Sequence, residues 1–209
     1  MPIWSITSSA RSVACSSALL TAKLQATLRA LVPACPSLSD LGAQMNDILH
    51  RDGIDNRFVT LFYLEMRPGS GALRFVNAGH NPPFVMRAQT TESLMASAIP
   101  LGMMAGTTYL EGDVKLEPGD LLVAYSDGLT EARDARDEEF GADRLKALLP
   151  SLRGLAAEQA VRVIIDEVNA FLGRERPHDD LSLVVLVRPG GSKPGIVPPP
   201  RVISPPRPV

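Results

Sequence analysis

Two acidic sites lie directly beside apolar segments of the sequence. Asp127, which Gly128 follows, comes just after Leu121–Tyr125, and the doublet Asp179-Asp180 comes just before Leu181–Val187. If both segments are core strands, their ends hold carboxylates on a rigid frame, where a hard cation such as Mg²⁺ or Mn²⁺ finds oxygen ligands. Glycine keeps the backbone open to close approach, and in a doublet one Asp can bind metal while the other supports it. The alternative is structural, because Asp-Gly and Asp doublets are both common in turns.

Histidine offers few catalytic candidates in this chain, which has only His50, His80 and His178. His80 lies in Gly79-His80-Asn81-Pro82-Pro83, a sharp turn that the glycine and prolines already explain, so a structural role comes first and contact with a substrate second. His50 ends a helical pattern, where capping the last carbonyls is the expected role. No Gly-rich phosphate loop, nucleophile elbow or His-Glu-x-x-His motif is present.

Composition excludes several classes of protein. The 209 residues include 21 Lys and Arg against 23 Asp and Glu, a net charge of −2, which excludes a sequence-independent grip on nucleic acid. No apolar stretch approaches the roughly 18 residues that a membrane-spanning helix needs, so membrane insertion is not expected. Cys15 and Cys35 are too few for a disulfide scaffold or a zinc site. A reduced, cytoplasmic protein is the expectation.

Hydrophobic periodicity predicts helices at both ends of the chain and strands between them. Leucines at helical spacing predict helices over residues 20–31 and 38–49, the second capped by Ser37 or Ser39. Strand and later helix patterns follow at Arg57–Met66, Ala72–Ala78, Phe84–Arg87, Tyr109–Leu116, Leu121–Tyr125, Asp143–Leu149, Ala156–Leu172 and Leu181–Val187. Short turns join most strands, so they pair antiparallel, and the fold class is α+β with helices outside antiparallel sheets.

Three zones divide the chain. Residues 1–17 are rich in serine without a clear period and predict a poorly ordered lead-in. Residues 18–188 form the folded body. Residues 189–209 carry eight prolines, which predicts an extended, disordered tail.

A series of motifs along the body resembles one family in order and spacing. They run Phe58–Tyr63, Asn77-Ala78-Gly79-His80-Asn81-Pro82-Pro83, Pro100-Leu101-Gly102, Pro118-Gly119-Asp120, Tyr125-Ser126-Asp127-Gly128-Leu129-Thr130-Glu131-Ala132, Glu139-Phe140-Gly141 with Arg144-Leu145, and Asp179-Asp180-Leu181-Ser182-Leu183. Together they resemble the bacterial stage II sporulation protein E-like branch of the metal-dependent (PPM, type 2C) serine/threonine phosphatases.

The resemblance implies a β-sandwich flanked by helices, with a binuclear Mn²⁺/Mg²⁺ centre at one end. It implies that Asp127 and Asp179 are metal ligands, with Asp180 and Gly128 supporting them and His80 open to a substrate contact. It also implies hydrolysis of phosphorylated regulatory proteins, often antagonists of anti-sigma factors.

The segment before the first helix departs from the family pattern. An Asp-x-Ser-Gly-x-Gly loop normally precedes that helix and supplies an Asp that bridges both metals, whereas here the first acidic residue is Asp40. We therefore expect the first strands of the sandwich to be missing, one weak metal site instead of two, and impaired activity. Loss or misreading of an upstream coding segment would explain the abrupt break before Ala18. The alternative is a non-catalytic member that binds a phosphoprotein or regulator.

Overall fold

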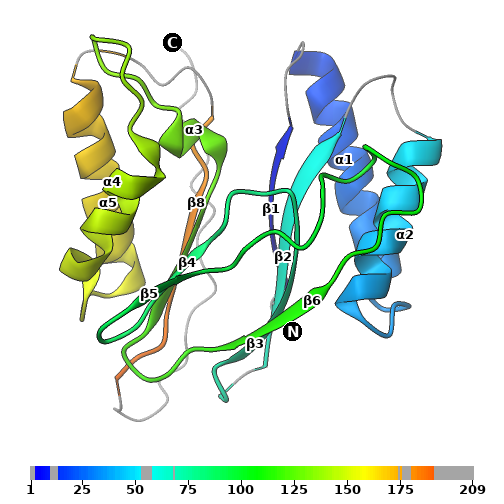
Figure 1. Ribbon diagram of the computed structural model, residues 1–209, viewed down its shortest axis with the longest axis horizontal. Coiled ribbons are helices and arrows are strands. Elements are labelled where there is room, and N and C mark those ends of the chain that lie inside the picture. Colours follow the sequence, from blue (N-terminus) through cyan, green and yellow to red (C-terminus); the bar gives the residue numbers. More distant parts are fainter. Residues whose placement is uncertain are drawn as a thin grey trace.

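Eight strands form two antiparallel sheets at the centre of the molecule (Figure 1). The computed structural model describes residues 3–9, 14–52, 58–67, 69–173, 175 and 180–190, with side chains from residue 22 onward. The strands are β1 (Ile3–Ser9), β2 (Val59–Met66), β3 (Ala72–Ala78), β4 (Phe84–Met86), β5 (Thr91–Ser93), β6 (Glu111–Lys115), β7 (Leu121–Tyr125) and β8 (Leu183–Val187). One sheet has the order β1-β2-β3-β6 and the other the order β5-β4-β7-β8.

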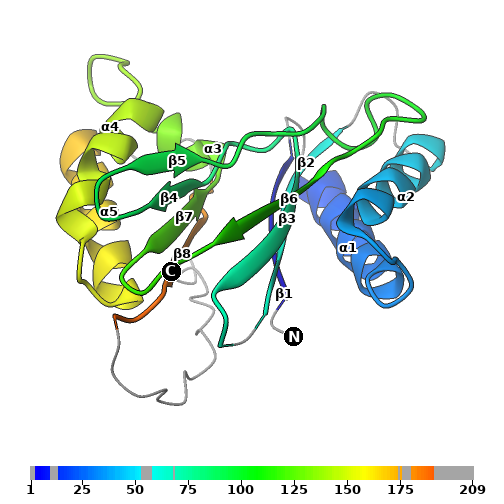
Figure 2. The same cartoon turned by 60° about the horizontal axis from the view of Figure 1, so that its bottom comes forward.

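Helices cover the outer face of each sheet, giving four layers (Figures 1 and 2). Helices α1 (Ala14–Leu31) and α2 (Leu38–Arg51) lie on the first sheet. Helices α4 (Gly141–Leu148) and α5 (Ala157–Leu172) lie on the second, which also carries the single turn α3 (Asp127–Thr130) at the end of β7. The predicted α+β class, with helices outside antiparallel sheets, is confirmed.

Strands β2 and β7 are apolar on both faces because each contributes to two cores. In β2, Leu61 and Tyr63 pack with the helices α1 and α2, whereas Phe62 and Leu64 pack between the sheets. In β7, Leu122 and Ala124 join the inter-sheet core, and the alternate residues face α4 and α5. This double burial explains why both strands read as continuous apolar runs in the sequence.

Helix α2 begins where the sequence placed its cap. The hydroxyl oxygen of Ser37 accepts a hydrogen bond from the Asp40 N–H (3.0 Å), which satisfies one of the donors left open at a helix start. Ser39, the other predicted cap, instead accepts from the N–H of Glu111 (3.1 Å) at the start of β6. Ser37 therefore fixes the start of α2, and Ser39 links α2 to β6.

The N-terminal region differs from the predicted lead-in over residues 1–17. Residues 3–9 form β1, which pairs antiparallel with β2 from Ile3 opposite Glu65 to Ser9 opposite Val59, and α1 begins at Ala14 rather than Ala18. One strand thus precedes the first helix, where the sequence predicted none. Ile3, Trp4, Ile6 and Thr7 all favour strands, but the serines among them conceal the pattern.

Smaller elements were also missed, and some predicted segments lie outside the described residues. Strand β5 is only Thr91–Ser93, too short for a periodic signal, and α3 replaces the turn considered after β7. Residues 191–209, most of the predicted tail, are outside the described ranges, as is Asp179. No helix in the described part of the chain has the length and apolar character needed to cross a membrane.

Candidate functional site

Asp127 begins α3 directly at the end of the buried strand β7. Its side chain is half-buried, and its Oδ1 atom accepts a hydrogen bond from the N–H of Gly128 (3.0 Å). The carbonyl of Asp127 accepts from the Glu131 N–H (2.8 Å), which closes the single helical turn. The rigid strand and this turn hold the carboxylate at one end of the second sheet, while the role of Asp127 as a metal ligand stays a prediction.

Ser126 fixes the chain that enters β8 beside Asp127. Its N–H donates to the carbonyl of Ser182 (2.9 Å), and its buried hydroxyl accepts from the N–H of Ser182 (2.9 Å) while donating to the carbonyl of Asp180 (3.2 Å). The backbone of Asp180 is therefore held next to the residue before Asp127, although the Asp180 residue itself is exposed. Sequence reasoning missed this role of Ser126; a serine between a buried strand and an acidic residue was the available signal.

His80 lies deep in the turn between β3 and β4. Gly79 has φ +67° and lies against Pro100, where an added Cβ would come within 2.6 Å of the ring, so only glycine fits before His80. The N–H of His80 donates to Oδ1 of the buried Asn77 (2.9 Å), and the ring Nδ1 lies 3.1 Å from the Thr60 hydroxyl. The structural role that the sequence placed first is thus visible in the backbone of the turn.

Burial dominates the electrostatics of the His80 ring. The imidazole is 2 % exposed, and burial lowers its pKa below the ordinary value. The Asp127 carboxylate and the Tyr125 carbonyl act more weakly in the opposite direction. Nε2 itself makes no hydrogen bond to any of the described residues. The fold therefore brings His80 and Asp127 to one place.

Of the two predicted metal ligands, only Asp127 lies among the described residues. Asp127 supplies a carboxylate at a rigid strand end, and peptide carbonyls lie nearby, which is the chemistry that Mg²⁺ and Mn²⁺ prefer. Within the described ranges, however, no group of three or more His, Cys, Asp or Glu side chains is arranged to hold a metal. Asp179, the second predicted ligand, lies outside those ranges, so its place at the site stays a prediction.

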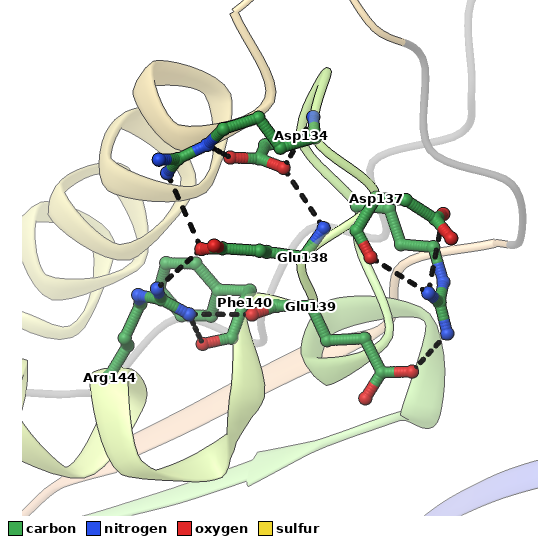
Figure 3. A network of polar contacts seen from close by, with 8 residues as sticks. Asp134, Asp137, Glu138, Glu139, Phe140 and Arg144 are labelled. Atoms are coloured by element: carbon green, nitrogen blue, oxygen red, sulfur yellow. Dashed lines mark hydrogen bonds and ion pairs between the residues drawn. The ribbon is translucent and has the colours of Figure 1, made fainter.

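The loop between α3 and α4 is held by charged side chains (Figure 3). The Asp134 carboxylate accepts from the N–H groups of Arg136 (2.9 Å) and Glu138 (3.0 Å). These donors, the Glu138 N–H above all, hold the pKa of Asp134 below its ordinary value. Arg144 in α4 pairs with the Glu138 carboxylate (3.6 Å) and donates to the Phe140 carbonyl (3.0 Å). The hydrogen bonds of the Asp134 carboxylate are therefore made within its own loop, and none of them is to Asp127.

Buried Asn46 in α2 fixes the segment that carries the Pro100-Leu101-Gly102 motif. Its Oδ1 accepts from the Gly102 N–H (2.9 Å), and its Nδ2 donates to the Met104 carbonyl (2.9 Å). His50, expected to cap its own helix, instead places Nδ1 3.1 Å from the Gly102 carbonyl. That expectation is corrected because α2 packs along this loop, which presents a carbonyl to the ring.

Comparison with known sequences finds related proteins over most of the folded body. Residues 15–189 match the family described as Stage II sporulation protein E (SpoIIE). Protein IcfG of Synechocystis sp. is 30% identical over 132 residues, which are 63% of this chain and 21% of that protein. Phosphoserine phosphatase RsbU of Bacillus subtilis is 30% identical over 146 residues, 69% of this chain and 43% of that protein. The chain spans less than half the length of these curated relatives.

Solved structures share the fold. The SiaA-PP2C domain of Pseudomonas aeruginosa aligns with TM-score 0.75 and 16% identity over 88% of this chain and 75% of that one. The SpoIIE phosphatase domain of Bacillus subtilis aligns with TM-score 0.64 and 20% identity over 95% of this chain and 85% of that one. The RsbU and RsbW domains of Rv1364c from Mycobacterium tuberculosis give TM-score 0.63 and 23% identity over 91% and 52%. The arrangement of sheets and helices is thus that of the PP2C fold.

Proposed function

This chain belongs to the stage II sporulation protein E (SpoIIE) family, and from that premise we propose that it is a metal-dependent protein serine/threonine phosphatase. The observation that carries the proposal is the position of Asp127 at the end of β7, clamped through Ser126 to the chain that enters β8. This clamp holds the backbone of Asp180, the second residue of the acidic doublet, beside the residue that precedes Asp127, which supports the proposal. The B. subtilis relative named a phosphoserine phosphatase supports the same activity.

Asp127 and Asp179 are the proposed ligands of Mn²⁺ or Mg²⁺, with Asp180 and Gly128 supporting them. When bound, the cation offsets charge on the phosphoryl oxygens and activates water. We expect one weak site, because the sequence has no acidic residue before Asp40 to bridge a pair of cations. Two such cations without an intervening anion repel each other strongly. Activity is therefore expected to be low compared with relatives that hold two metals.

The proposed substrate is a phosphorylated regulatory protein of the anti-sigma-factor-antagonist type. The proposed location of the reaction is the cytoplasm. Two comparisons support a regulatory setting: the phosphoserine phosphatase RsbU, and a solved chain that combines RsbU and RsbW domains. The net charge of −2 gives no basis for a nucleic-acid partner.

The second candidate is a non-catalytic member that binds a phosphoprotein or regulator without hydrolysing it. One observation favours it: the described residues hold no cluster of three metal-ligating side chains. Retention of Asp127 and Asp179 argues against it, because a binding protein has no need of both carboxylates.

A Mn²⁺ titration distinguishes the two candidates. Hydrolysis of p-nitrophenyl phosphate and of a phosphoserine-containing antagonist protein is measured with and without Mn²⁺, in the native chain and in Asp127→Asn. Mn²⁺-dependent hydrolysis that disappears in the variant supports the phosphatase. Binding of the phosphoprotein without turnover supports the second candidate, and neither binding nor hydrolysis contradicts both.

A further inference from the structure

One ring nitrogen of His80, Nε2, is buried without a hydrogen-bond partner. Among the buried side-chain nitrogen and oxygen atoms that the structure describes, only its Nε2 lacks a hydrogen-bond partner. A buried polar atom left unpaired costs about 1–3 kcal/mol, so native proteins keep few of them without a reason. The turn that contains His80 does not supply that reason, because its backbone bond to Asn77 leaves the ring out.

Strand pairing places this ring at the end of the sheet where Asp127 lies. Strands β4 and β7 run antiparallel, with Phe84 opposite Val123 and Met86 opposite Leu121. Followed beyond the paired residues, the two chains carry His80 and Asp127 toward the same end. The Asp127 carboxylate also acts electrostatically on the ring, in agreement with this placement.

The groups around the ring select one tautomer. On one side, Nδ1 lies 3.1 Å from the Thr60 hydroxyl, which is able to donate or accept. The Tyr125 carbonyl and the Asp127 carboxylate also act on the ring, and both groups can only accept a hydrogen bond. Because Thr60 already occupies Nδ1, a proton on Nε2 is the arrangement that these accepting groups favour, whereas a lone pair on Nε2 would be repelled by them. Nδ1 is then the acceptor for the proton of the Thr60 hydroxyl.

We propose that His80 is a positioning residue for Asp127: Thr60 holds the neutral ring with its proton on Nε2, and that N–H attracts the Asp127 carboxylate electrostatically and so orients it. Because Nε2 is closed to solvent, it acts through Asp127 and does not itself touch the substrate. The inference deepens the proposed function and rests on it, since it concerns the same carboxylate.

The tautomer is measured first, in the metal-free protein. A long-range ¹H–¹⁵N correlation spectrum at about pH 8, above the ordinary histidine pKa of about 6.5, shows which ring nitrogen carries the proton. His50 is the internal control, because its Nδ1 faces the Gly102 carbonyl and must donate. We expect opposite tautomers for His80 and His50, with signals assigned from His50→Gln, His80→Gln and His178→Gln. A proton on Nδ1 of His80 overturns the proposal.

Metal affinity is measured next, by Mn²⁺ calorimetry. His80→Leu removes the N–H donor and should weaken binding by about 10–100-fold, the usual effect of losing a group that supports a ligand. His80→Gln offers an N–H at a similar distance and should retain most of the affinity. Thr60→Val should weaken binding as well, while Thr60→Ser, which keeps the hydroxyl, should not.

The outcomes separate this inference from the proposed function. Equal Mn²⁺ affinity in His80→Leu and the native chain overturns positioning, as does equal loss in His80→Gln and His80→Leu, which indicates a packing role only. If His80→Leu does not fold, the Thr60→Val and Thr60→Ser pair decides. If the native chain binds no Mn²⁺, the proposed function fails, and the tautomer spectrum still decides whether the ring directs its N–H as inferred.

Discussion

Ser126 and Ser182 exchange two hydrogen bonds that join the end of β7 to the start of β8. The N–H of Ser126 donates to the Ser182 carbonyl (2.9 Å), and the N–H of Ser182 donates to the Ser126 hydroxyl oxygen (2.9 Å). The first bond continues the antiparallel ladder beyond Tyr125 opposite Leu183, whereas the second needs a side chain. A serine directly before Asp127 is therefore part of the framework that positions the acidic end of the sheet.

Ser126→Ala should destabilise the protein and loosen the approach to β8. The variant removes the buried Ser126 hydroxyl, which accepts from the Ser182 N–H and donates to the Asp180 carbonyl. Because Ser182 and Asp180 are exposed, the loss of these two bonds should cost about 0.5–1.5 kcal/mol. Urea unfolding measures the loss. Ser151→Ala is the matched control, because the hydroxyl of Ser151 is exposed and bonds only to the Leu148 carbonyl; its effect should stay within about 0.5 kcal/mol. Equal losses of stability in the two variants would contradict a stabilising role for the Ser126 hydroxyl.

Asp127→Asn should abolish Mn²⁺ binding with little change in stability. The amide oxygen still accepts from the Gly128 N–H, so the turn is retained, while the negative charge that attracts the cation is lost. Asp179→Asn should have the same effect. Asp143→Asn in the first turn of α4 removes a carboxylate remote from Asp127 and serves as control. If calorimetry finds unchanged Mn²⁺ binding in Asp127→Asn or Asp179→Asn, the substituted residue is not a metal ligand.

Acid should loosen the loop between α3 and α4. The pKa of Asp134 is lowered in the folded protein, chiefly by the Glu138 N–H, so its stabilising effect is present above the unfolded pKa of about 3.9. That effect is lost as the pH falls through the lower, folded pKa. The amide proton shifts of Arg136 and Glu138 should move together in this range, and Asp134→Asn should remove the transition. A transition that persists in Asp134→Asn would assign it to another group.

Asn46→Leu should release the loop that follows β5. The substitution leaves the Gly102 N–H without its acceptor, removes one of the two donors to the Met104 carbonyl and introduces an apolar side chain among polar groups, at a cost of about 1–3 kcal/mol. Tyr109→Phe is the milder comparison, because it removes a single hydroxyl, which lies 3.2 Å from the Ile99 carbonyl and 3.3 Å from Oδ1 of Asn46, and leaves the Asn46 bonds to Gly102 and Met104 in place. Amide hydrogen exchange of residues 99–109 should rise strongly in the first variant and slightly in the second. The opposite order would show that Tyr109, rather than Asn46, anchors the loop.

The sequence alone determined the local elements and the place of the chemistry along the chain. Strands β2 and β7, the hairpin between β2 and β3, and the Ser37 cap of α2 follow from residue types and periods within a few positions. Asp127 stood out for the same reason, since a carboxylate directly after a run of five buried residues must lie at the edge of the core. Local conformational preference is carried by neighbouring residues, so it can be read without knowing the fold.

Only the tertiary structure decided which distant segments meet. Pairing with β2 turns a serine-rich segment into β1, because backbone hydrogen bonds to a partner strand do not require an apolar period. The exchange between Ser126 and Ser182, and the burial of His80 beside Asp127, depend on which strands are neighbours in the second sheet. Hydrogen bonds and burial between residues far apart in sequence are set by the packing of whole layers, and no single segment encodes them.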